Sequence, residues 1–322
     1  MKTILLTNHY PKEPYDIVMS ELPEGFELQM LDENTQECIE SAVGCADYIL
    51  ASGRVKITKS VLDKAKKIKM IQRTGVGLDS LDLEELKKRN IPLYVNQGIN
   101  AESVAEHTLL LMLACMRKLP IVYGNTKNGI WKKQQQGVQT FEIAGKNVGL
   151  IGMGNIARSV VRLLKGFNVN IFYYTPFRLS EDREKELGIT YCSYEQLLPK
   201  VDILSLHCPL TEQNKHIVDE NFIALMKDGA ILVNTARGGL VDTVAVINAL
   251  RTGKLAFAGL DVHEEEPLAA ENLITKLDNV ILTPHIGGIT NESFRRMMHD
   301  AMRNIKKFDN GELEDISRYL YS

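Results

Sequence analysis

The hydrophobic residues of this chain gather in short runs, and stretches with helical periodicity separate these runs from one end of the chain to the other. This alternation is typical of parallel β-sheets joined by crossover helices. Ten runs are predicted as strands, at residues 2–7, 48–51, 70–74, 93–96, 148–151, 170–174, 203–206, 230–234, 256–261 and 280–283. Ten strands are too many for one small sheet, so the pattern indicates an α/β chain that must be divided.

Two links offer places for that division. The first, residues 96–100, is polar and contains glycine, and it leads into an unusually apolar helix predicted over residues 101–113. The second, residues 284–288, precedes an amphipathic helix predicted over residues 291–308. We therefore expect two domains, which a chain of 322 residues can form with a separate core in each.

The composition is that of an ordinary soluble globular protein, with 44% hydrophobic and 25% charged residues. A net charge of −3 argues against a nucleic-acid partner, and no apolar stretch reaches the roughly 18 residues of a membrane span. The five cysteines lack the close pairing of a zinc site or redox dithiol, so no metal is expected and a reducing compartment is favoured. Because the N-terminal apolar run is too short for a signal peptide, these features predict a cytoplasmic protein.

A glycine turn follows one of the predicted strands. Gly152, Gly154 and Ala157 form a Gly-x-Gly-x-x-Ala pattern between that strand and the start of a helix, which is the placement that a dinucleotide-binding turn requires. Gly152 permits the tight turn, Gly154 lets the backbone approach a pyrophosphate, and the small Ala157 lets the helix pack on the strand. The amides of Asn155 and Ile156 would meet the phosphates at the positive end of the helix.

Three later segments contain the chemical groups needed to reduce a 2-keto acid. Arg237 lies in Asn-Thr-Ala-Arg-Gly-Gly, Glu266 ends the run Asp-Val-His-Glu-Glu-Glu before a proline, and His285 lies in Thr-Pro-His-Ile-Gly-Gly. An arginine can hold a carboxylate in a two-pronged grip. A histidine can donate a proton near neutral pH, and a neighbouring glutamate raises the histidine pKa by favouring its charged form.

In these motifs and in their order, nearly the whole chain resembles the D-isomer-specific 2-hydroxyacid dehydrogenase family. The resemblance implies an α/β fold of two doubly wound parallel-sheet domains, with a Rossmann dinucleotide-binding domain inserted into a flavodoxin-like substrate domain. Residues 99–287 would form the first domain, and residues 1–98 with 288–322 the second. The implied activity is NAD(P)-dependent interconversion of a D-2-hydroxy acid and its 2-keto acid, of the hydroxypyruvate, glyoxylate, phosphoglycerate or lactate type.

The resemblance also implies the catalytic roles. Arg237 would bind the substrate carboxylate and carbonyl, and Glu266 would orient and charge His285. His285 would then pass the proton while the nicotinamide passes the hydride. Glu266 is preferred to Glu264 and Glu265 because the family's acid directly precedes the proline.

A set of cofactor-binding residues follows from the same resemblance: Gly152, Gly154, Asn155, Ile156, Thr175, Arg178, Cys208, Pro209, Thr235, Ala236, Asp261, Gly287 and Gly288. In this set Cys208 would line the adenosine site without acting as a nucleophile, and Asp261 would bind the nicotinamide carboxamide. Thr175 departs from the family's common acidic residue, which would accept hydrogen bonds from the ribose and repel a 2′-phosphate. With Arg178 three residues further on, the hypothesis is that NADP is used. The alternative is that Thr175 bonds the ribose while Arg178 faces solvent, which leaves NAD adequate.

Substrate contacts are expected at Ser52, Gly53, Gly75, Val76 and Gly77, in addition to Arg237 and His285. Glycines let the backbone point several amides at one anion, and the resemblance places the amides of Val76 and Gly77 on the substrate carboxylate. Ser52 and Gly53 would suit a small polar tail. Arg54 would suit a second anionic end such as phosphate, and the sequence leaves open whether its side chain reaches the pocket.

The apolar helix from residue 101 has too many apolar faces for the surface of a monomer, and it is either buried within one subunit or shared between two. The resemblance favours a homodimer through this helix and the arm that contains Trp131. Two rival functions remain: an NAD(P)-sensing protein of the corepressor type, and a phosphite or formate dehydrogenase. Glu266 argues against formate, because formate enzymes of this fold usually lack a glutamate paired with the histidine.

Overall fold

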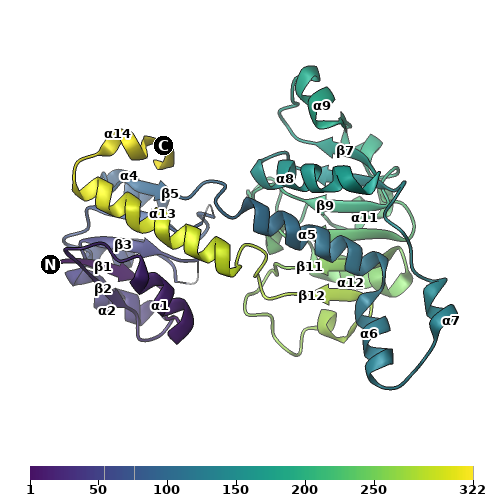
Figure 1. Cartoon of the computed structure of the whole chain (residues 1–322), viewed down its shortest axis with the longest axis horizontal. Coiled ribbons are helices and arrows are strands. Elements are labelled where there is room, and N and C mark those ends of the chain that lie inside the picture. The colour runs from purple at the N-terminus through teal and green to yellow at the C-terminus, as the bar shows by residue number, and fades with distance from the viewer. Residues whose placement is uncertain (54, 76, 322) are drawn as a thin grey trace. The chain divides into compact units, whose positions relative to one another are not determined.

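The computed structural model describes residues 1–53, 55–75 and 77–321. The chain forms two compact units, one made of Met1–Asn100 and Asn291–Ser322 and the other of Ala101–Thr290. It therefore leaves the first unit once and returns to it. In Figure 1 the purple N-terminal elements and the yellow C-terminal helix α13 belong to this same first unit.

The first unit contains a parallel five-stranded sheet with the order β2-β1-β3-β4-β5, which is the flavodoxin-like doubly wound order. Its strands are β1 (Lys2–Leu6), β2 (Phe26–Met30), β3 (Tyr48–Ala51), β4 (Met70–Arg73) and β5 (Leu93–Val95). Its helices are α1 (Lys12–Ser20), α2 (Gln36–Ala42), α3 (Lys59–Lys64), α4 (Leu83–Lys88), α13 (Asn291–Asp309) and α14 (Leu313–Ile316).

Successive side chains of a strand point to opposite faces, and both faces of this sheet are buried. Ile4 and Leu6 of β1 pack in a core with residues of α1 and α13, whereas Leu5 packs in a second core with residues of α2, α3 and α4. This burial on both faces explains why the central strands are continuous apolar runs in the sequence.

The second unit contains a parallel seven-stranded sheet with the order β12-β11-β10-β9-β6-β7-β8, which is a Rossmann sheet with one added strand. Its strands are β6 (Asn147–Ile151), β7 (Asn170–Tyr174), β8 (Ile189–Tyr191), β9 (Ile203–Leu206), β10 (Ala230–Asn234), β11 (Leu255–Leu260) and β12 (Val280–Leu282). Helices α5 (Ala101–Met116) and α8 (Asn155–Leu164) pack on one face. Helices α10 (Tyr194–Leu197), α11 (Glu220–Leu225) and α12 (Thr243–Thr252) pack on the other, and α9 (Glu181–Leu187) precedes β8.

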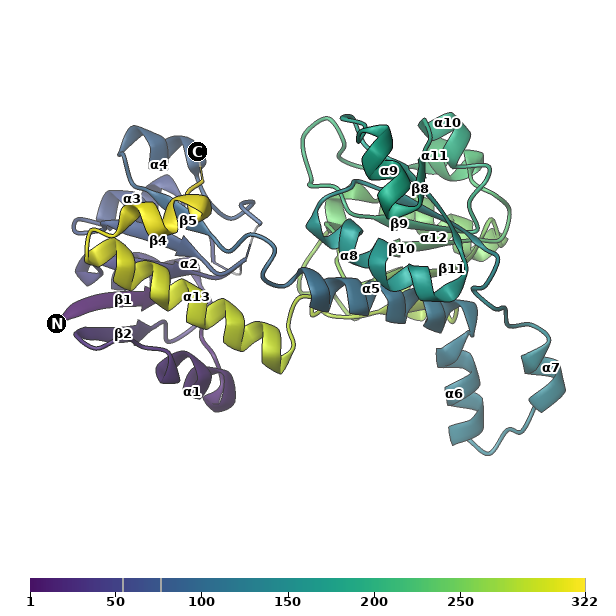
Figure 2. The ribbon, with the colours of Figure 1, turned by 45° about the horizontal axis from the view of Figure 1, so that its top comes forward.

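An arm made of α6 (Leu119–Lys127) and α7 (Lys133–Gly137) extends from the end of α5, as Figure 2 shows. Neither of its helices has a buried residue. Large apolar side chains are exposed along the arm and just before it, namely Leu110, Leu119, Tyr123, Ile130, Trp131, Val138 and Phe141. Most of α5 itself is buried in the second unit, so the unpartnered apolar surface belongs chiefly to the arm.

The predicted fold class is confirmed: all ten predicted strands are present, in two doubly wound sheets. Two further strands, β2 and β8, were not predicted. Both lie at the edge of a sheet. In β2 only Phe26 is buried and polar residues interrupt the apolar ones, and in β8 Thr190 does the same, so neither forms a continuous apolar run. Among the described residues, no helix is long and apolar enough to cross a membrane.

Candidate active site

Arg237, Glu266 and His285 follow three neighbouring strands of the second unit. Arg237 comes after β10, Glu266 after β11 and His285 after β12, and these strands pair in parallel in that order. The carboxyl ends of parallel strands meet at one edge of the sheet, which is where doubly wound folds bind their ligands. The topology thus brings residues 48 positions apart to one sheet edge.

His285 and Glu266 form a direct ion pair, in which Nδ1 of the imidazole lies 2.8 Å from Oε2 of the carboxylate. The other carboxylate oxygen accepts a hydrogen bond from the backbone amide of His263 at 3.0 Å. Burial raises the Glu266 pKa, but the hydrogen bonds from His285 and His263 outweigh it and hold this pKa below the ordinary value. Among the described residues, Glu266 is the only hydrogen-bond partner of the His285 ring, so Nε2 is left available to a substrate.

The turn that contains His285 is held by Asp261. His285 adopts a φ of 57°, in the left-handed region that residues other than glycine rarely occupy. Its amide donates to the backbone carbonyl of Asp261 at 2.7 Å, and the next two amides, of Ile286 and Gly287, donate to the Asp261 carboxylate at 3.0 and 2.8 Å. Three successive amides therefore bind one residue, which stabilises the unusual conformation of the histidine.

The Asp261 carboxylate is only 2% exposed and accepts two further contacts on its buried side. The Thr283 hydroxyl donates to Oδ1 at 2.6 Å, and Nε2 of His107 lies 3.4 Å from the same oxygen. Burial by itself would raise the Asp261 pKa, but these hydrogen bonds together with the two amides lower it far below its usual range. Asp261 is therefore ionised throughout the neutral range.

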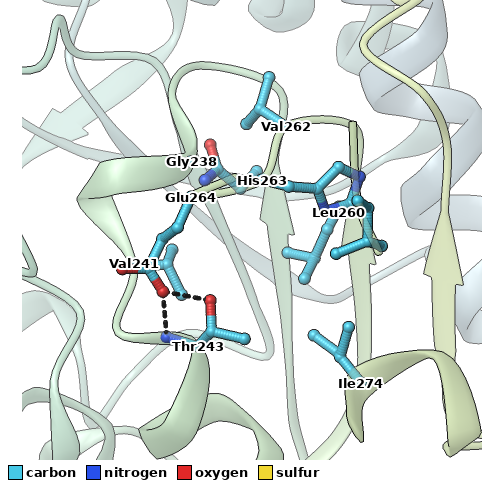
Figure 3. A pocket seen from close by; sticks show the side chains of 10 residues that line it. Gly238, Val241, Thr243, Leu260, Val262, His263, Glu264 and Ile274 are labelled. Atoms are coloured by element: carbon cyan, nitrogen blue, oxygen red, sulfur yellow. Dashed lines mark hydrogen bonds between the residues drawn. The ribbon is translucent and has the colours of Figure 1, made fainter. Parts of the chain in front are cut away.

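The loop that contains Arg237 packs backbone against backbone on the loop that contains Glu266. A Cβ atom at Gly238 would lie 2.0 Å from the carbonyl carbon and oxygen of His263, so only glycine fits there. Figure 3 shows this contact and the small pocket beside it, which is also lined by Leu260 and Ile274. With a volume of about 10 Å³ the pocket has room for roughly one water molecule, so it is not a substrate site.

The glycine turn lies at the point where the strand order of the second sheet reverses, with β6 between β9 and β7. Gly152 has a φ of 96°, and a Cβ atom there would lie 2.6 Å from the carbonyl oxygen of His207. Gly154 is the N-cap of α8, and no side chain caps the amides of the first turn at Asn155 and Ile156. A close backbone approach with uncapped helix amides fits the pyrophosphate of a dinucleotide.

At the end of β7, Arg178 is held by a buried carboxylate. Its Nε and Nη2 donate to Oε1 and Oε2 of Glu184 at 2.8 and 2.9 Å, and the buried Tyr173 hydroxyl donates to Oε1 at 2.7 Å. The Arg178 guanidinium lowers the Glu184 pKa to about 2. From the sequence there were two hypotheses for Arg178, that it favours NADP or that it faces solvent, and neither included an ion pair with Glu184. Thr175, directly after the strand, is partly exposed.

Burial sets the protonation of two side chains at the end of β9. It lowers the His207 pKa to about 4, so the ring is neutral at pH 7, with Nε2 lying 3.0 Å from the Ser205 hydroxyl. Burial also raises the Cys208 pKa to about 11, so its thiol stays protonated and is a poor nucleophile. Pro209 follows on the surface.

The remaining residues expected near the nicotinamide follow β10 and β12. The Thr235 hydroxyl lies 2.8 Å from that of Thr108 on α5, and the Ala236 amide donates to Asn234 at 3.0 Å. A Cβ atom at Gly287 would lie 2.9 Å from Asp261 Oδ2. Gly288 is half-buried beside it.

The expected substrate loops of the first unit follow β3 and β4, which are neighbours in its sheet. The buried Arg73 joins them, because its Nη1 donates to the Ala51 carbonyl at 3.1 Å and its Nε to the Gly77 carbonyl at 2.6 Å. The Ser52 hydroxyl donates to the Thr7 carbonyl at 3.3 Å. A Cβ atom at Gly53 would meet Arg73 Nη2 at 3.1 Å, whereas one at Gly75 would meet nothing within 4 Å. Arg54 and Val76 lie outside the described residues.

Several residues that support the site were not singled out from the sequence. They are His107, Thr283, Glu184, His216 and Glu264. Except for Glu184, whose partners Arg178 and Tyr173 are 6 and 11 positions away, each acts through a partner distant in the chain, so no local motif marks it. Glu264 is one of three consecutive glutamates, and it was set aside in favour of Glu266 when the sequence alone was considered. Among the described residues, no group of His, Cys, Asp or Glu could hold a metal ion.

Comparison with known proteins agrees with this geometry. Residues 109–287 match the family described as D-isomer specific 2-hydroxyacid dehydrogenase, NAD binding domain. Glyoxylate reductase of Thermococcus litoralis is 39% identical over 80% of this chain and 79% of its own. D-3-phosphoglycerate dehydrogenase of Methanocaldococcus jannaschii is 37% identical over 98% of this chain, which spans 59% of that longer protein. The structure of D-lactate dehydrogenase of Aquifex aeolicus, complexed with NAD and lactic acid, is similar with a TM-score of 0.87 and 31% identity, covering 99% of this chain and 98% of that one.

The fold, the site and these matches define an oxidoreductase that uses a nicotinamide cofactor and interconverts hydroxy and keto acids. The chain belongs to the D-isomer-specific 2-hydroxyacid dehydrogenase family.

Proposed function

We propose that this chain reduces a short 2-keto acid, of the glyoxylate or hydroxypyruvate type, to the D-2-hydroxy acid. The observation that carries the proposal is the 2.8 Å pair between His285 and Glu266, in the loops after β12 and β11, with Arg237 in the loop after the neighbouring strand β10. In this proposal the second unit binds the dinucleotide and supplies the chemistry, and the first unit contributes substrate contacts. When bound, the dinucleotide supplies a hydride for reduction and accepts one for oxidation.

The residues of the chain bind the acid and move the proton. The Arg237 guanidinium holds the substrate carboxylate and carbonyl, which places the carbonyl oxygen near His285. Nε2 of His285 gives its proton to that oxygen, and the Glu266 carboxylate stabilises the charged ring before the transfer. In the oxidation direction the neutral ring takes the proton from the hydroxyl.

The substrate loops favour a small acid. Ser52 and Gly53 add little bulk, with the Ser52 hydroxyl buried and donating to the Thr7 carbonyl, and the backbone at Gly75 can approach an anion. The assignment of a small acid is also supported by similar proteins named glyoxylate reductase and hydroxypyruvate reductase. A lactate-type or phosphoglycerate-type substrate would use the same catalytic groups, so relative kcat/KM values distinguish these substrates from glyoxylate and hydroxypyruvate.

Initial rates of NADH and NADPH oxidation against glyoxylate, hydroxypyruvate, pyruvate, longer 2-keto acids and phosphohydroxypyruvate test this proposal. We expect the highest kcat/KM for glyoxylate or hydroxypyruvate. A preference for phosphohydroxypyruvate would overturn the small-acid assignment. Tight dinucleotide binding without turnover of any acid would favour the rival NAD(P)-sensing function, and turnover of phosphite or formate would favour the other rival.

The pairing of Glu266 with His285 is tested by the pH profile of reduction. Replacing Glu266 with Gln removes the negative charge that stabilises protonated His285, so the pH at which the rate falls on the alkaline side should move lower. Glu265→Gln, at an exposed neighbouring position, is the matched control. An alkaline limb that stays in place in Glu266→Gln would contradict the proposed pairing.

We further propose that the adenosine end admits NADP(H) as well as NAD(H). Thr175 has no carboxylate to repel a 2′-phosphate, but the charge of Arg178 is already neutralised by Glu184. Thr175→Asp should shift the NADPH/NADH ratio of kcat/KM toward NADH. Glu184→Gln should shift it toward NADPH by releasing Arg178, and Glu181→Gln, on the exposed start of α9, should leave it unchanged. Equal ratios in all variants would refute the proposal.

We also propose a homodimer formed through the arm of α6 and α7. Trp131 and Val138 are each 80% exposed, and together with Tyr123 they form more apolar surface than a monomer usually leaves open. Light scattering should give twice the chain mass of 36.2 kDa for the wild type. Trp131→Glu should lower this mass, and Phe177→Glu, at an equally exposed aromatic residue outside the arm, should not.

Five unpaired cysteines support the cytoplasmic location predicted from the sequence.

A further inference from the structure

Glu264, two positions before Glu266, makes a second ion pair between a carboxylate and a histidine. Its Oε1 lies 2.6 Å from Nε2 of His216. Its Oε2 accepts a 3.0 Å hydrogen bond from the Thr243 amide and another from the Thr243 hydroxyl, both drawn in Figure 3. Thr243 is the first residue of α12, so the carboxylate also lies at the positive end of that helix.

These contacts join the loop of Glu266 to the loop of Arg237. Thr243 begins the helix that directly follows residues 237–242, and the amide of His216 donates to the Gly239 carbonyl at 2.8 Å. His216 reaches this position with a φ of 52°, in the left-handed region. The close contact of Gly238 with the His263 backbone lies between the two connections. One carboxylate therefore binds the C-terminal end of the Arg237 loop directly, and its middle through His216, to the loop that supplies Glu266.

We propose that Glu264 is a positioning residue for the reaction: with His216 and Thr243 it fixes the Arg237 loop relative to the Glu266 loop. This inference rests on the proposed roles of Arg237, Glu266 and His285. Arg237 holds the substrate and Glu266 orients the proton donor, so a shift between their loops displaces the carbonyl oxygen from Nε2 of His285. Displacements of about 1 Å in such a geometry can cost on the order of 100-fold in rate.

Steady-state kinetics of Glu264→Ala and Glu265→Ala separate this role from a general loop effect. Glu265 is exposed and, among the described residues, has no hydrogen-bond or ion-pair partner, which makes it the matched control. We expect kcat to fall by about 10- to 100-fold in Glu264→Ala and to change less than about 2-fold in Glu265→Ala. Because Glu266 remains beside His285, the alkaline limb of the pH profile should stay in place, unlike that of Glu266→Gln.

A double-mutant cycle checks that His216 acts through Glu264. His216→Gln should lower kcat by itself, and adding it to Glu264→Ala should cost little more, because the pair is already broken. Additive losses would overturn the proposal, as would equal kcat values for folded Glu264→Ala and Glu265→Ala. If Glu264→Ala does not fold, His216→Gln and Thr243→Val decide: wild-type kcat in both would refute the role.

Amide hydrogen exchange tests the same inference without turnover. Glu264→Ala should speed exchange in peptides that cover residues 237–243 and 261–267, and Glu265→Ala should not. Unchanged exchange in Glu264→Ala would overturn the proposal whatever the activity of the chain. Conversely, faster exchange together with a wild type that turns over no keto acid would count against the proposed function and not against the loop contact.

Discussion

The carboxyl edges of the two sheets differ in how closely their glycines are packed. In the second unit, Cβ atoms at Gly152, Gly238 and Gly287 would lie 2.6, 2.0 and 2.9 Å from neighbouring atoms of other loops. In the first unit, a Cβ atom at Gly53 would meet only an arginine nitrogen at 3.1 Å, and one at Gly75 would meet nothing within 4 Å. Three glycines thus fill tight contacts at the second edge, where Gly154 is as open as Gly75, whereas neither Gly53 nor Gly75 of the first edge meets backbone.

The difference matches the tasks proposed for the two edges. Proton and hydride transfer need groups held in a narrow range of positions, and interlocked loops limit their movement. Binding a small anion needs accessible amides, which an open glycine turn provides. Substitutions at the two edges should therefore have effects of very different size.

The largest effect is expected at Gly238. In Gly238→Ala the new Cβ meets the His263 backbone at 2.0 Å, so the loops of Arg237 and Glu266 must move apart. We expect kcat/KM to fall by about 100-fold or more. Gly239→Ala is the matched control, because its Cβ would meet only the flexible Leu210 side chain at 2.9 Å. Similar kinetics for the two variants would show that the backbone contact does not restrain the site.

Asp261→Asn should have the next largest effect. The neutral amide cannot accept equally from Ile286, Gly287 and Thr283, so the His285 turn loosens, and we expect a loss of about 1–3 kcal/mol in unfolding free energy and a clear fall in kcat. Because the folded-state pKa of Asp261 is lowered, its stabilising contribution is present above the ordinary carboxyl pKa and is lost as pH falls through the lowered value. The stability difference between wild type and variant should therefore stay nearly constant from pH 7 to about pH 5 and shrink only below the ordinary carboxyl pKa of 3.8, which denaturant unfolding at about pH 7, 5 and 2 would measure. A difference that already shrinks between pH 7 and pH 5 would contradict this assignment.

Arg73→Met tests the first unit, and its effect should fall chiefly on substrate binding. The substitution removes the bonds from Arg73 to the Ala51 and Gly77 carbonyls and frees the two substrate loops from each other. We expect KM for the keto acid to rise by about 10-fold while KM for the dinucleotide stays near the wild-type value, because the dinucleotide residues lie in the other unit. Equal rises in both constants would point to general unfolding.

The smallest effect is expected for Gly75→Ala. Its Cβ meets open space and its φ is not in the left-handed region, so the free energy of unfolding should stay within about 1 kcal/mol of the wild type. A several-fold rise in KM for the keto acid alone would show that the substrate approaches this turn. No change in either KM would remove Gly75 from the substrate site and weaken the contrast between the edges.

Much of this protein could be predicted from local patterns. The central strands are buried on both faces and are continuous apolar runs, and the short edge strands β5 and β12 are also apolar throughout, so all of them were found. In β2 and β8 polar residues interrupt the apolar ones, and both were missed. Arg237, Glu266 and His285 were predicted because each closes a short apolar run and because their motifs resemble those of the family. The choice of Glu266 over Glu264 and Glu265 came from that resemblance alone.

What only the tertiary structure decided is how the charges are paired. Arg178 is neutralised by Glu184, Asp261 binds the turn of His285, and Glu264 joins His216 across 48 positions of the chain. In each case the sequence shows a charged residue in an ordinary loop or helix. Its partner is determined by which strand ends and helix ends the folded sheet brings within about 3 Å, the distance at which a hydrogen bond forms. Residue identity thus determined which reaction the chain is suited to, and the packing of distant loops determined how firmly each group is held for it.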